Sequence, residues 1–140
     1  MSDLKKEILE HLAQDVFCRL GASPVHGVGV FAIRPIAKGS NPLKSRLKHR
    51  EILFSHEELK GLAPGVRKQI EMFCYYDDDG VMISSVGLNT MDFSIYLNHS
   101  KTPNLRMNKD GSFVALQRIK IGDELTMDYD HSFDAEHNFD

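Results

Sequence analysis

Three short segments of the chain combine residue types that can bind a ligand or take part in catalysis. Residues 26–32 read HGVGVFA, with two glycines one residue apart, and residues 98–104 read NHSKTPN, which is dense in polar turn formers. Residues 122–129 read GDELTMDY and place a turn before an extended run that ends in a tyrosine. Glycines let the backbone approach a ligand closely, and amide, imidazole and phenol groups can bind or orient one. These segments are therefore the first candidates for a functional site.

Taken singly, each segment has an ordinary structural interpretation. Gly27 and Gly29 lack the third glycine and the following helix of a dinucleotide fingerprint, so alone they are more typical of a hairpin turn or a β-bulge. His99 alone is typical of a hydrogen-bonded polar residue, and the chain has no GxSxG motif that would indicate a serine hydrolase. Tyr129 alone is typical of a core or surface aromatic.

Taken together, in this order and spacing, the segments resemble the SET-domain family of protein lysine methyltransferases. The family pattern has a glycine pair followed by an apolar residue and often alanine, then an I-x-x-G element, here residues 27–32 and 36–39. It continues with apolar residues before N-H-S-C-x-P-N and closes with G-E/D-E-L-T-x-D-Y, here residues 96–104 and 122–129. The resemblance covers residues 16–131. It implies a mostly β, α+β fold in which short sheets surround a pseudoknot, with a few short helices.

The resemblance also implies an activity and a set of site residues. It implies transfer of a methyl group from S-adenosylmethionine to a lysine of a protein or peptide, a histone tail being one candidate. Tyr129 is the implied catalytic residue, because the family places this hydroxyl near the point of methyl transfer. Tyr96 and Phe133 are implied to line the channel for the substrate lysine. The implied cofactor-binding residues are His26, Gly27, Val28, Gly29, Asn98 and His99.

The chemistry explains why such residues suit the reaction. The attacking lysine amine must be neutral, and deprotonating an ordinary lysine at pH 7 costs about 4.6 kcal/mol. Removing the ammonium from water and placing it near a positive sulfur both lower that cost. Holding the amine in line with the methyl group contributes several kcal/mol more. We therefore expect Tyr129 to orient the amine rather than to act as a strong base.

Two departures from the family pattern affect the substrate side of the site. The cysteine of N-H-S-C is Lys101 here, and no C-x-C follows Tyr129, so the C-terminal zinc module of some members is not expected, and neither is a metal. The tail or another subunit would then have to close the substrate channel. Residues 40–43 read SNPL where the family often has glutamate and an aromatic. These departures keep open a second interpretation, a catalytically weak SET-like module that binds a peptide or cofactor.

The periodicity of the chain predicts the elements that position these segments. Many short strands with turns between them, and no long helix–strand alternation, favour a mostly β or irregular α+β fold. The expected domains are an N-terminal helix over residues 1–15, the SET domain over 16–131 and an acidic tail over 132–140. Helices are predicted at residues 4–12 with Ser2 or Asp3 as the cap, at 55–61 from the Ser55 and Glu58 capping box, and from Pro64. Strands are predicted within residues 28–33, 81–84, 113–119 and 125–129, with a turn at 77–80.

Composition limits the class of protein. The chain has 140 residues, 41% hydrophobic and 26% charged, which suggests one globular domain with one core. A net charge of -3 fits a lysine-rich partner better than nucleic acid. No apolar run reaches the length of a membrane span and residues 1–10 lack a secretory signal, so we expect an intracellular protein with no membrane partner.

The remaining expectations concern thiols, metal and assembly. Cys18 and Cys74 are too far apart for a CxxC motif and are predicted to be buried, reduced thiols. A metal site in the tail is a less favoured alternative to a solvated acidic segment; it would use His131, Asp134, Glu136 and His137. The apolar face of the N-terminal helix could support a homodimer.

Overall fold

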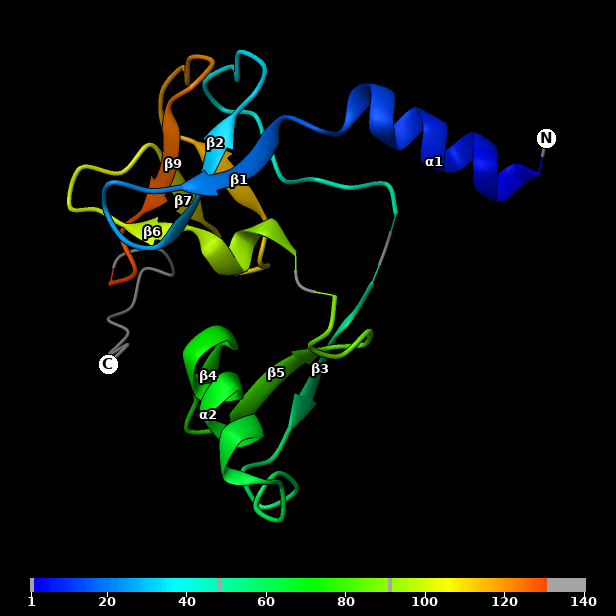
Figure 1. Ribbon diagram of the computed structural model, residues 1–140, viewed down its shortest axis with the longest axis vertical. Helices are drawn as coiled ribbons and strands as arrows, with labels where there is room; N and C mark the ends of the chain where they lie inside the picture. The colour runs from blue at the N-terminus through cyan, green and yellow to red at the C-terminus, as the bar shows by residue number, and fades with distance from the viewer. Residues whose placement is uncertain (1, 48, 91, 131–140) are drawn as a thin grey trace. The chain divides into compact units, whose positions relative to one another are not determined.

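The structure is a computed structural model that describes residues 2–47, 49–90 and 92–130 (Figure 1). The chain divides into two compact units. Unit 1 comprises Met1–Leu47 and Tyr96–Asp140, and unit 2 comprises Lys48–Ile95. Within the described ranges, no helix has the length and apolar character needed to cross a membrane. The domain boundaries expected from the sequence stay a prediction.

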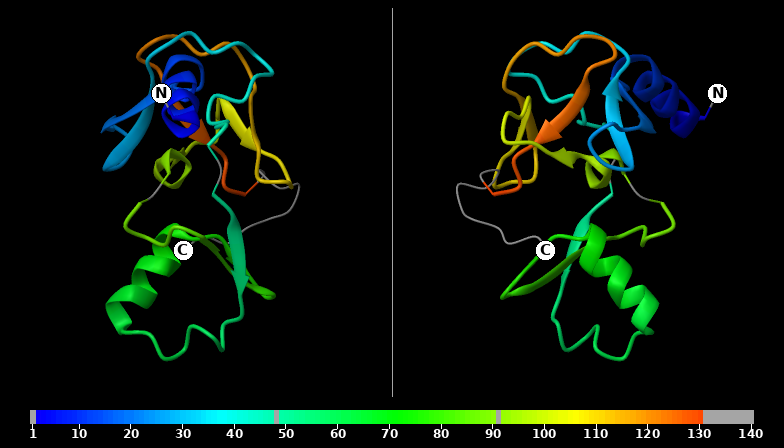
Figure 2. Two further views of the ribbon diagram at one scale, coloured as in Figure 1. Left: turned by 90° about the vertical axis from the view of Figure 1, so that its right-hand side faces the viewer. Right: turned by 60° about the vertical axis from the view of Figure 1, so that its left-hand side comes forward.

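A six-stranded sheet forms the framework of unit 1. Five strands follow the order β1-β2-β9-β7-β8, and β6 also pairs with β9. The strands are β1 (Cys18–Ala22), β2 (Val28–Ala32), β6 (Asn98–His99), β7 (Leu105–Met107), β8 (Phe113–Ala115) and β9 (Glu124–Met127). The pairs β1–β2, β2–β9 and β7–β8 are antiparallel, whereas β6 and β7 both run parallel to β9. Figure 2 shows orange β9 inside this sheet, with the early and the late strands on either side of it.

Strand β9 is central to the core of unit 1. Leu125, Thr126 and Met127 are all buried, so the strand is covered on both faces and does not alternate between apolar and polar residues. The largest fully buried side chains are Val30, Ile36, Leu97, Leu105, Ile119 and Leu125. Most of them lie on β2, β7 and β9 or directly before β6, so the core forms where the early and late parts of the chain meet.

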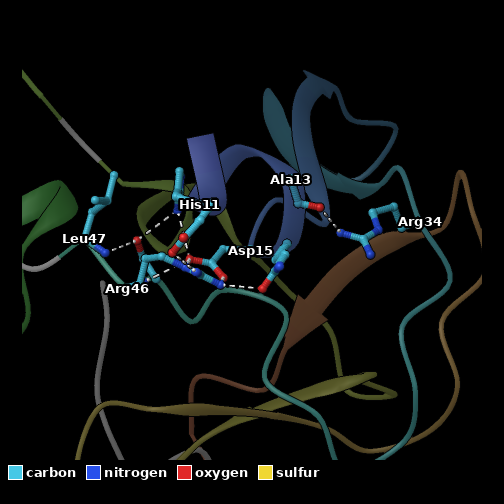
Figure 3. Close-up of polar contacts among 9 residues, drawn as sticks. His11, Ala13, Asp15, Arg34, Arg46 and Leu47 are labelled. Carbon is cyan, nitrogen blue, oxygen red and sulfur yellow. Dashed lines mark hydrogen bonds and ion pairs between the residues drawn. The ribbon is translucent and has the colours of Figure 1, made fainter. Parts of the chain in front are cut away.

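Helix α1 (Asp3–Gln14) is attached to unit 1 through its polar side (Figure 3). Ser2 caps it, because its Oγ accepts a hydrogen bond from the backbone N–H of Lys5. The guanidinium of Arg46 donates to both carboxylate oxygens of Asp15 at 2.9 and 3.0 Å, and it also pairs with Glu10 at 3.1 Å. No residue of α1 is buried. The helix and its Ser2 cap are therefore as the sequence predicts.

Unit 2 has a small core of its own. Helix α2 (Pro64–Phe73) packs against the sheet β3-β5-β4, made of β3 (Glu51–Phe54), β4 (Tyr76–Asp77) and β5 (Gly80–Ser84). Ile70, Cys74 and Val81 are its buried residues. The predicted turn at 77–80 is confirmed, because Asp77 Oδ1 accepts hydrogen bonds from the N–H groups of Asp79 and Gly80. The predicted helix at Pro64 and the strand at 81–84 are confirmed as well.

Two sequence predictions about elements are wrong in part. The capping-box bonds of Ser55 and Glu58 do form, but residues 55–61 are turns rather than a helix. So short a segment ends before additional hydrogen bonds can repay the cost of helix nucleation. The strand predicted at 113–119 ends at Ala115, because the N–H of Leu116 bonds to the carbonyl of Asn104 and Ile119 forms an isolated bridge with Ile36.

Both cysteines are free and buried, as predicted. Burial raises the pKa of the Cys18 thiol to about 12, and burial likewise raises the pKa of Cys74. Both thiols are therefore protonated near neutral pH.

Candidate active site

The two polar segments that the sequence singles out lie side by side at β6 and β9. In the parallel register of this pair, Asn98 faces Thr126 and His99 faces Met127. The ladder continues with a 3.0 Å bond from the N–H of Ser100 to the carbonyl of Met127. Because β9 also pairs with β2, the glycine segment joins the same sheet. The sequence prediction that these segments form one site is consistent with this arrangement.

Asn104 fastens the two polar segments together. Its Nδ2 donates to the carbonyl of Glu124 at 2.8 Å, and its Oδ1 accepts from the N–H of Thr126 at 2.9 Å. One amide side chain therefore bonds to the backbone on both sides of Leu125, in the way that a neighbouring strand would. No local pattern in the sequence indicates this role, because the partners of Asn104 lie 20 and 22 residues further along the chain.

Asn98 connects the glycine segment to β9. The residue is 8% exposed, and its Nδ2 lies 3.0 Å from the carbonyl oxygen of His26, 3.3 Å from that of Val28 and 2.8 Å from Oε2 of Glu124. Three of the predicted cofactor-binding residues, His26, Val28 and Asn98, are therefore in direct contact.

The two glycines serve different purposes. Gly27 has a φ of 49° and lies in the β1–β2 turn, where its carbonyl accepts from the N–H of Ser23 at 2.8 Å. Such a φ favours glycine, and a Cβ there would meet no heavy atom within 4 Å, so this backbone is open. At Gly29 a Cβ would collide with the carboxylate of Glu124. Gly27 thus fits both the turn and the close-approach interpretations, whereas Gly29 makes room for a side chain of the protein itself.

His99 and Tyr129 contact each other at the end of β9. The backbone N–H of Tyr129 donates to Nδ1 of His99 at 3.2 Å, and the ring centroids are 5.2 Å apart. Because Nδ1 accepts, the ring proton of a neutral His99 is on Nε2. The Tyr129 hydroxyl donates to the carbonyl oxygen of Leu97, and burial raises the pKa of this phenol. Tyr129 is therefore a protonated, oriented phenol, which suits positioning better than proton abstraction.

Lys101, which occupies the family's cysteine position, forms ion pairs with the residues flanking Tyr129. Its Nζ lies 2.9 Å from Asp130 and 3.8 Å from Asp128. The hydrogen bond with Asp130 raises the pKa of Lys101, so the ammonium stays charged. An ion pair thus links the NHS segment to the end of the DY segment at this position.

Of the two predicted substrate-channel residues, the structure describes Tyr96 but not Phe133. Tyr96 ends the 3-10 helix η1 (Phe93–Tyr96) and directly precedes Leu97, the partner of the Tyr129 hydroxyl, so it lies next to the site in the chain. Its role in a channel stays a prediction. Phe133 and the tail residues considered for a metal, His131, Asp134, Glu136 and His137, lie outside the described residues. Among the described residues, no group of three His, Cys, Asp or Glu side chains could hold a metal ion.

Unit 2 contains a hollow of its own. It has a volume of about 240 Å³ and belongs entirely to unit 2, where it is lined by His56, Leu59, Arg67, Ile70, Glu71, Tyr76 and Val81. It contains none of the predicted site residues.

Comparison with known proteins decides the family. The model of the SET domain matches residues 27–130. The chain belongs to the SET domain family. No curated protein sequence matches this SET domain significantly. The prediction of a mostly β, SET-type fold is confirmed by this match and by the similar structures described next.

Several solved structures share the fold. A candidate histone methyltransferase of Plasmodium falciparum aligns with a TM-score of 0.53 at 19% identity, covering 84% of this chain and 96% of that one. An inhibitor-bound humanized mutant of the Chaetomium thermophilum Polycomb Repressive Complex 2 aligns with a TM-score of 0.56 at 26% identity over 87% of this chain. The same complex bound to S-adenosylmethionine aligns with a TM-score of 0.56 at 24% identity. This SET domain spans only 16% of each Chaetomium chain.

The residues around Asn98 fit the methionine end of S-adenosylmethionine, which carries a positive sulfur and a positive ammonium. The carbonyls of His26 and Val28 and the carboxylate of Glu124 all accept from Nδ2 of Asn98. Among the described residues no donor reaches Oδ1 of Asn98, so this oxygen is available to an ammonium. The open backbone at Gly27 gives a ligand access. Oδ1 of Asn98 beside this open turn therefore suits a cationic ligand.

Proposed function

We propose that this SET domain is an S-adenosylmethionine-dependent protein lysine N-methyltransferase. The observation that supports this most is the parallel pairing of β6 with β9, which brings Asn98, His99 and Tyr129 into one site. When bound, the cofactor would supply the electrophile, which is the methyl group on its positively charged sulfur. Its proposed holders are Asn98, His99 and the backbone of residues 26–29.

Tyr129 is the proposed catalytic residue. Its hydroxyl donates to the carbonyl of Leu97, and we propose that the phenol oxygen accepts a hydrogen bond from the N–H of an incoming amine. This interaction orients the amine without requiring a strong base. The hydrogen bond to His99 fixes the backbone at Tyr129, so the cofactor-side histidine and the catalytic tyrosine are held as one group.

The proposed substrate is a lysine-containing protein tail, with histones as the first to test. The net charge of -3 favours a basic peptide, and one of the similar solved structures is a candidate histone methyltransferase. The test is incubation of the full chain with labelled cofactor and a mixture of core histones, followed by mass spectrometry of the lysines. Methyl transfer to another basic protein but not to histones would support the proposed activity and contradict histones as the substrate.

A second candidate function is a module that binds a peptide or cofactor without turnover. The departure of residues 40–43 from the family pattern supports it. The retained Asn98, His99 and Tyr129, joined by the contacts described above, favour the enzyme. Cofactor binding without methyl transfer to any protein of a cell extract would favour the module.

We also propose that α1 supports a homodimer. Its polar side is engaged by Arg46, and its exposed leucines and isoleucine lie elsewhere on the helix, namely Leu4, Ile8, Leu9 and Leu12. Light scattering of the wild type and of Leu4→Glu/Leu12→Glu tests this. A monomeric wild type would rule the dimer out.

A further inference from the structure

Glu124, the first residue of β9, joins segments that are distant in the sequence. Its Oε1 and Oε2 lie 2.8 and 2.9 Å from Oγ of Ser23, which is 101 residues away, and Oε2 also lies 2.8 Å from Nδ2 of Asn98. Gly29 leaves the space that this carboxylate occupies. Neither the sequence motifs nor the roles assigned so far explain why a carboxylate is needed at this position.

Both partners of Glu124 must donate to it. Oγ of Ser23 already accepts hydrogen bonds from the N–H groups of Val25 at 3.0 Å and His26 at 3.3 Å, so its own hydrogen is directed to the carboxylate. Nδ2 of Asn98 has only acceptors around it, the carbonyls of His26 and Val28 as well as Glu124. An ionised carboxylate accepts at both oxygens, whereas an amide or a protonated carboxyl places a hydrogen donor on one of them.

Because the groups around Nδ2 of Asn98 are all acceptors, they also fix the orientation of the Asn98 amide. If the amide were turned over, its Oδ1 would face two carbonyl oxygens and a carboxylate, and three acceptor–acceptor contacts would replace three hydrogen bonds. Glu124 therefore helps to keep Oδ1 of Asn98 directed away from the network. Through Ser23 it also holds the turn that carries His26 and Gly27.

We propose that Glu124 is a positioning residue for cofactor binding. Its carboxylate holds the turn at residues 23–29 and the Asn98 amide in the orientation that receives the methionine end of the cofactor. This proposal rests on the proposed function, since the ligand is the same S-adenosylmethionine. It adds that affinity for the cofactor depends on a side chain that acts through Ser23 and Asn98.

The test compares Glu124→Gln with Asp123→Asn. Both variants remove one negative charge at adjacent positions, but the carboxylate of Asp123 accepts from the N–H of Lys120 in the turn before β9, and an asparagine side chain keeps an acceptor there. Calorimetry measures binding of S-adenosylhomocysteine, the demethylated cofactor. We expect Glu124→Gln to weaken binding on the order of tenfold, the loss typical of one hydrogen bond to a charged group, and Asp123→Asn to bind like wild type.

Two further readouts separate positioning from a general loss of structure. In the cofactor-free protein, hydrogen exchange at the amides of Val25 and His26 should speed up in Glu124→Gln, while exchange in β7 and β8 stays unchanged. In turnover assays the KM for the cofactor should rise while the KM for the peptide does not. If Glu124→Gln does not fold, Ser23→Ala should show a smaller loss of affinity in the same direction, and Ser23→Thr should restore it.

The outcomes distinguish the two proposals. Equal affinities of wild type and Glu124→Gln, or of wild type and Ser23→Ala where the first does not fold, would overturn the role of Glu124 and leave the proposed function standing. A wild-type protein that binds neither S-adenosylmethionine nor S-adenosylhomocysteine would overturn the proposed function, and the positioning role would be lost with it.

Discussion

The backbone N–H of Tyr129 donates a hydrogen bond to Nδ1 of His99 across 3.2 Å, although the two residues are 30 positions apart in the sequence. This bond links the end of the DY segment to the NHS segment. It gives the proposed catalytic tyrosine a fixed backbone and gives a neutral His99 a defined tautomer, with its proton on Nε2.

Replacing Tyr129 with phenylalanine should abolish most methyl transfer. The variant keeps the ring packed against His99 but loses the phenol oxygen that we propose orients the amine, and removing one such oriented group typically costs about 10²-fold or more in kcat. Binding of S-adenosylhomocysteine and the far-UV circular dichroism spectrum should be unchanged. Tyr75→Phe is the matched control, since its hydroxyl contacts Asp77 in unit 2. Full turnover in Tyr129→Phe would refute the assignment.

Replacing Asn104 with alanine should destabilise unit 1. The variant loses the bonds to the carbonyl of Glu124 and the N–H of Thr126 and leaves both strand groups without a partner in a part-buried position. We expect a loss of about 2–4 kcal/mol in the free energy of unfolding, measured by urea denaturation. Asn108→Ala removes one bond to Ser112 and should cost about 1 kcal/mol or less. Equal losses in the two variants would show that Asn104 does not act as the clip.

The ion pair between Arg46 and Asp15 should make stability fall at low pH. The hydrogen bonds from Arg46 hold the pKa of Asp15 well below its usual range. A depressed pKa means that this contribution is complete above the ordinary value near 3.9 and is lost as the pH falls toward the folded-state value. In Arg46→Met the decline in stability below about pH 4 should therefore be shallower than in wild type.

Exposed Arg118→Met serves as the control for this pH profile, which thermal unfolding at a series of pH values can record. Its profile should follow the wild type. Identical profiles for wild type and Arg46→Met would mean that the ion pair contributes nothing to stability in solution.

The two cysteines should resist thiol reagents in the folded protein. Burial raises the pKa of Cys18 to about 12 and also raises that of Cys74, so little thiolate exists at pH 8 and access is blocked. A colorimetric thiol assay should detect neither residue before urea is added and both after. An exposed cysteine introduced as Lys60→Cys should react at once. Rapid labelling of Cys18 in the native wild type would contradict the burial described here.

The functional segments 98–104 and 122–129 could be recognised because, together and in order, they resemble the motifs of the SET-domain family. Helix α1 with its Ser2 cap and the turn at 77–80 could be predicted from local periodicity and turn-forming residues. Strand β6 could not be predicted, because two residues, Asn98 and His99, show no alternation. Strand β1 was missed because Gly21 interrupts its pattern, and β7 because it has only three residues.

The contacts that assemble the site escaped prediction for a different reason. Asn104 and Glu124 act on partners 20 to 101 residues away, and neither side chain differs in type from an ordinary surface polar residue. Only the position of β9 between β2 and β6 shows that the side chains of Asn104 and Glu124 bond to partners on neighbouring strands and turns. Sequence motifs thus indicated which segments carry the chemistry, and the fold was needed to show what holds them in place.

The most direct measurement of the central claim is mass spectrometry of lysine residues in core histones and other basic proteins after incubation with the full chain and S-adenosylmethionine. Our account predicts that wild type adds methyl groups to a defined lysine and that Tyr129→Phe, at equal cofactor saturation, adds far fewer. If wild type binds the cofactor but leaves every lysine unmodified, the methyltransferase assignment is contradicted.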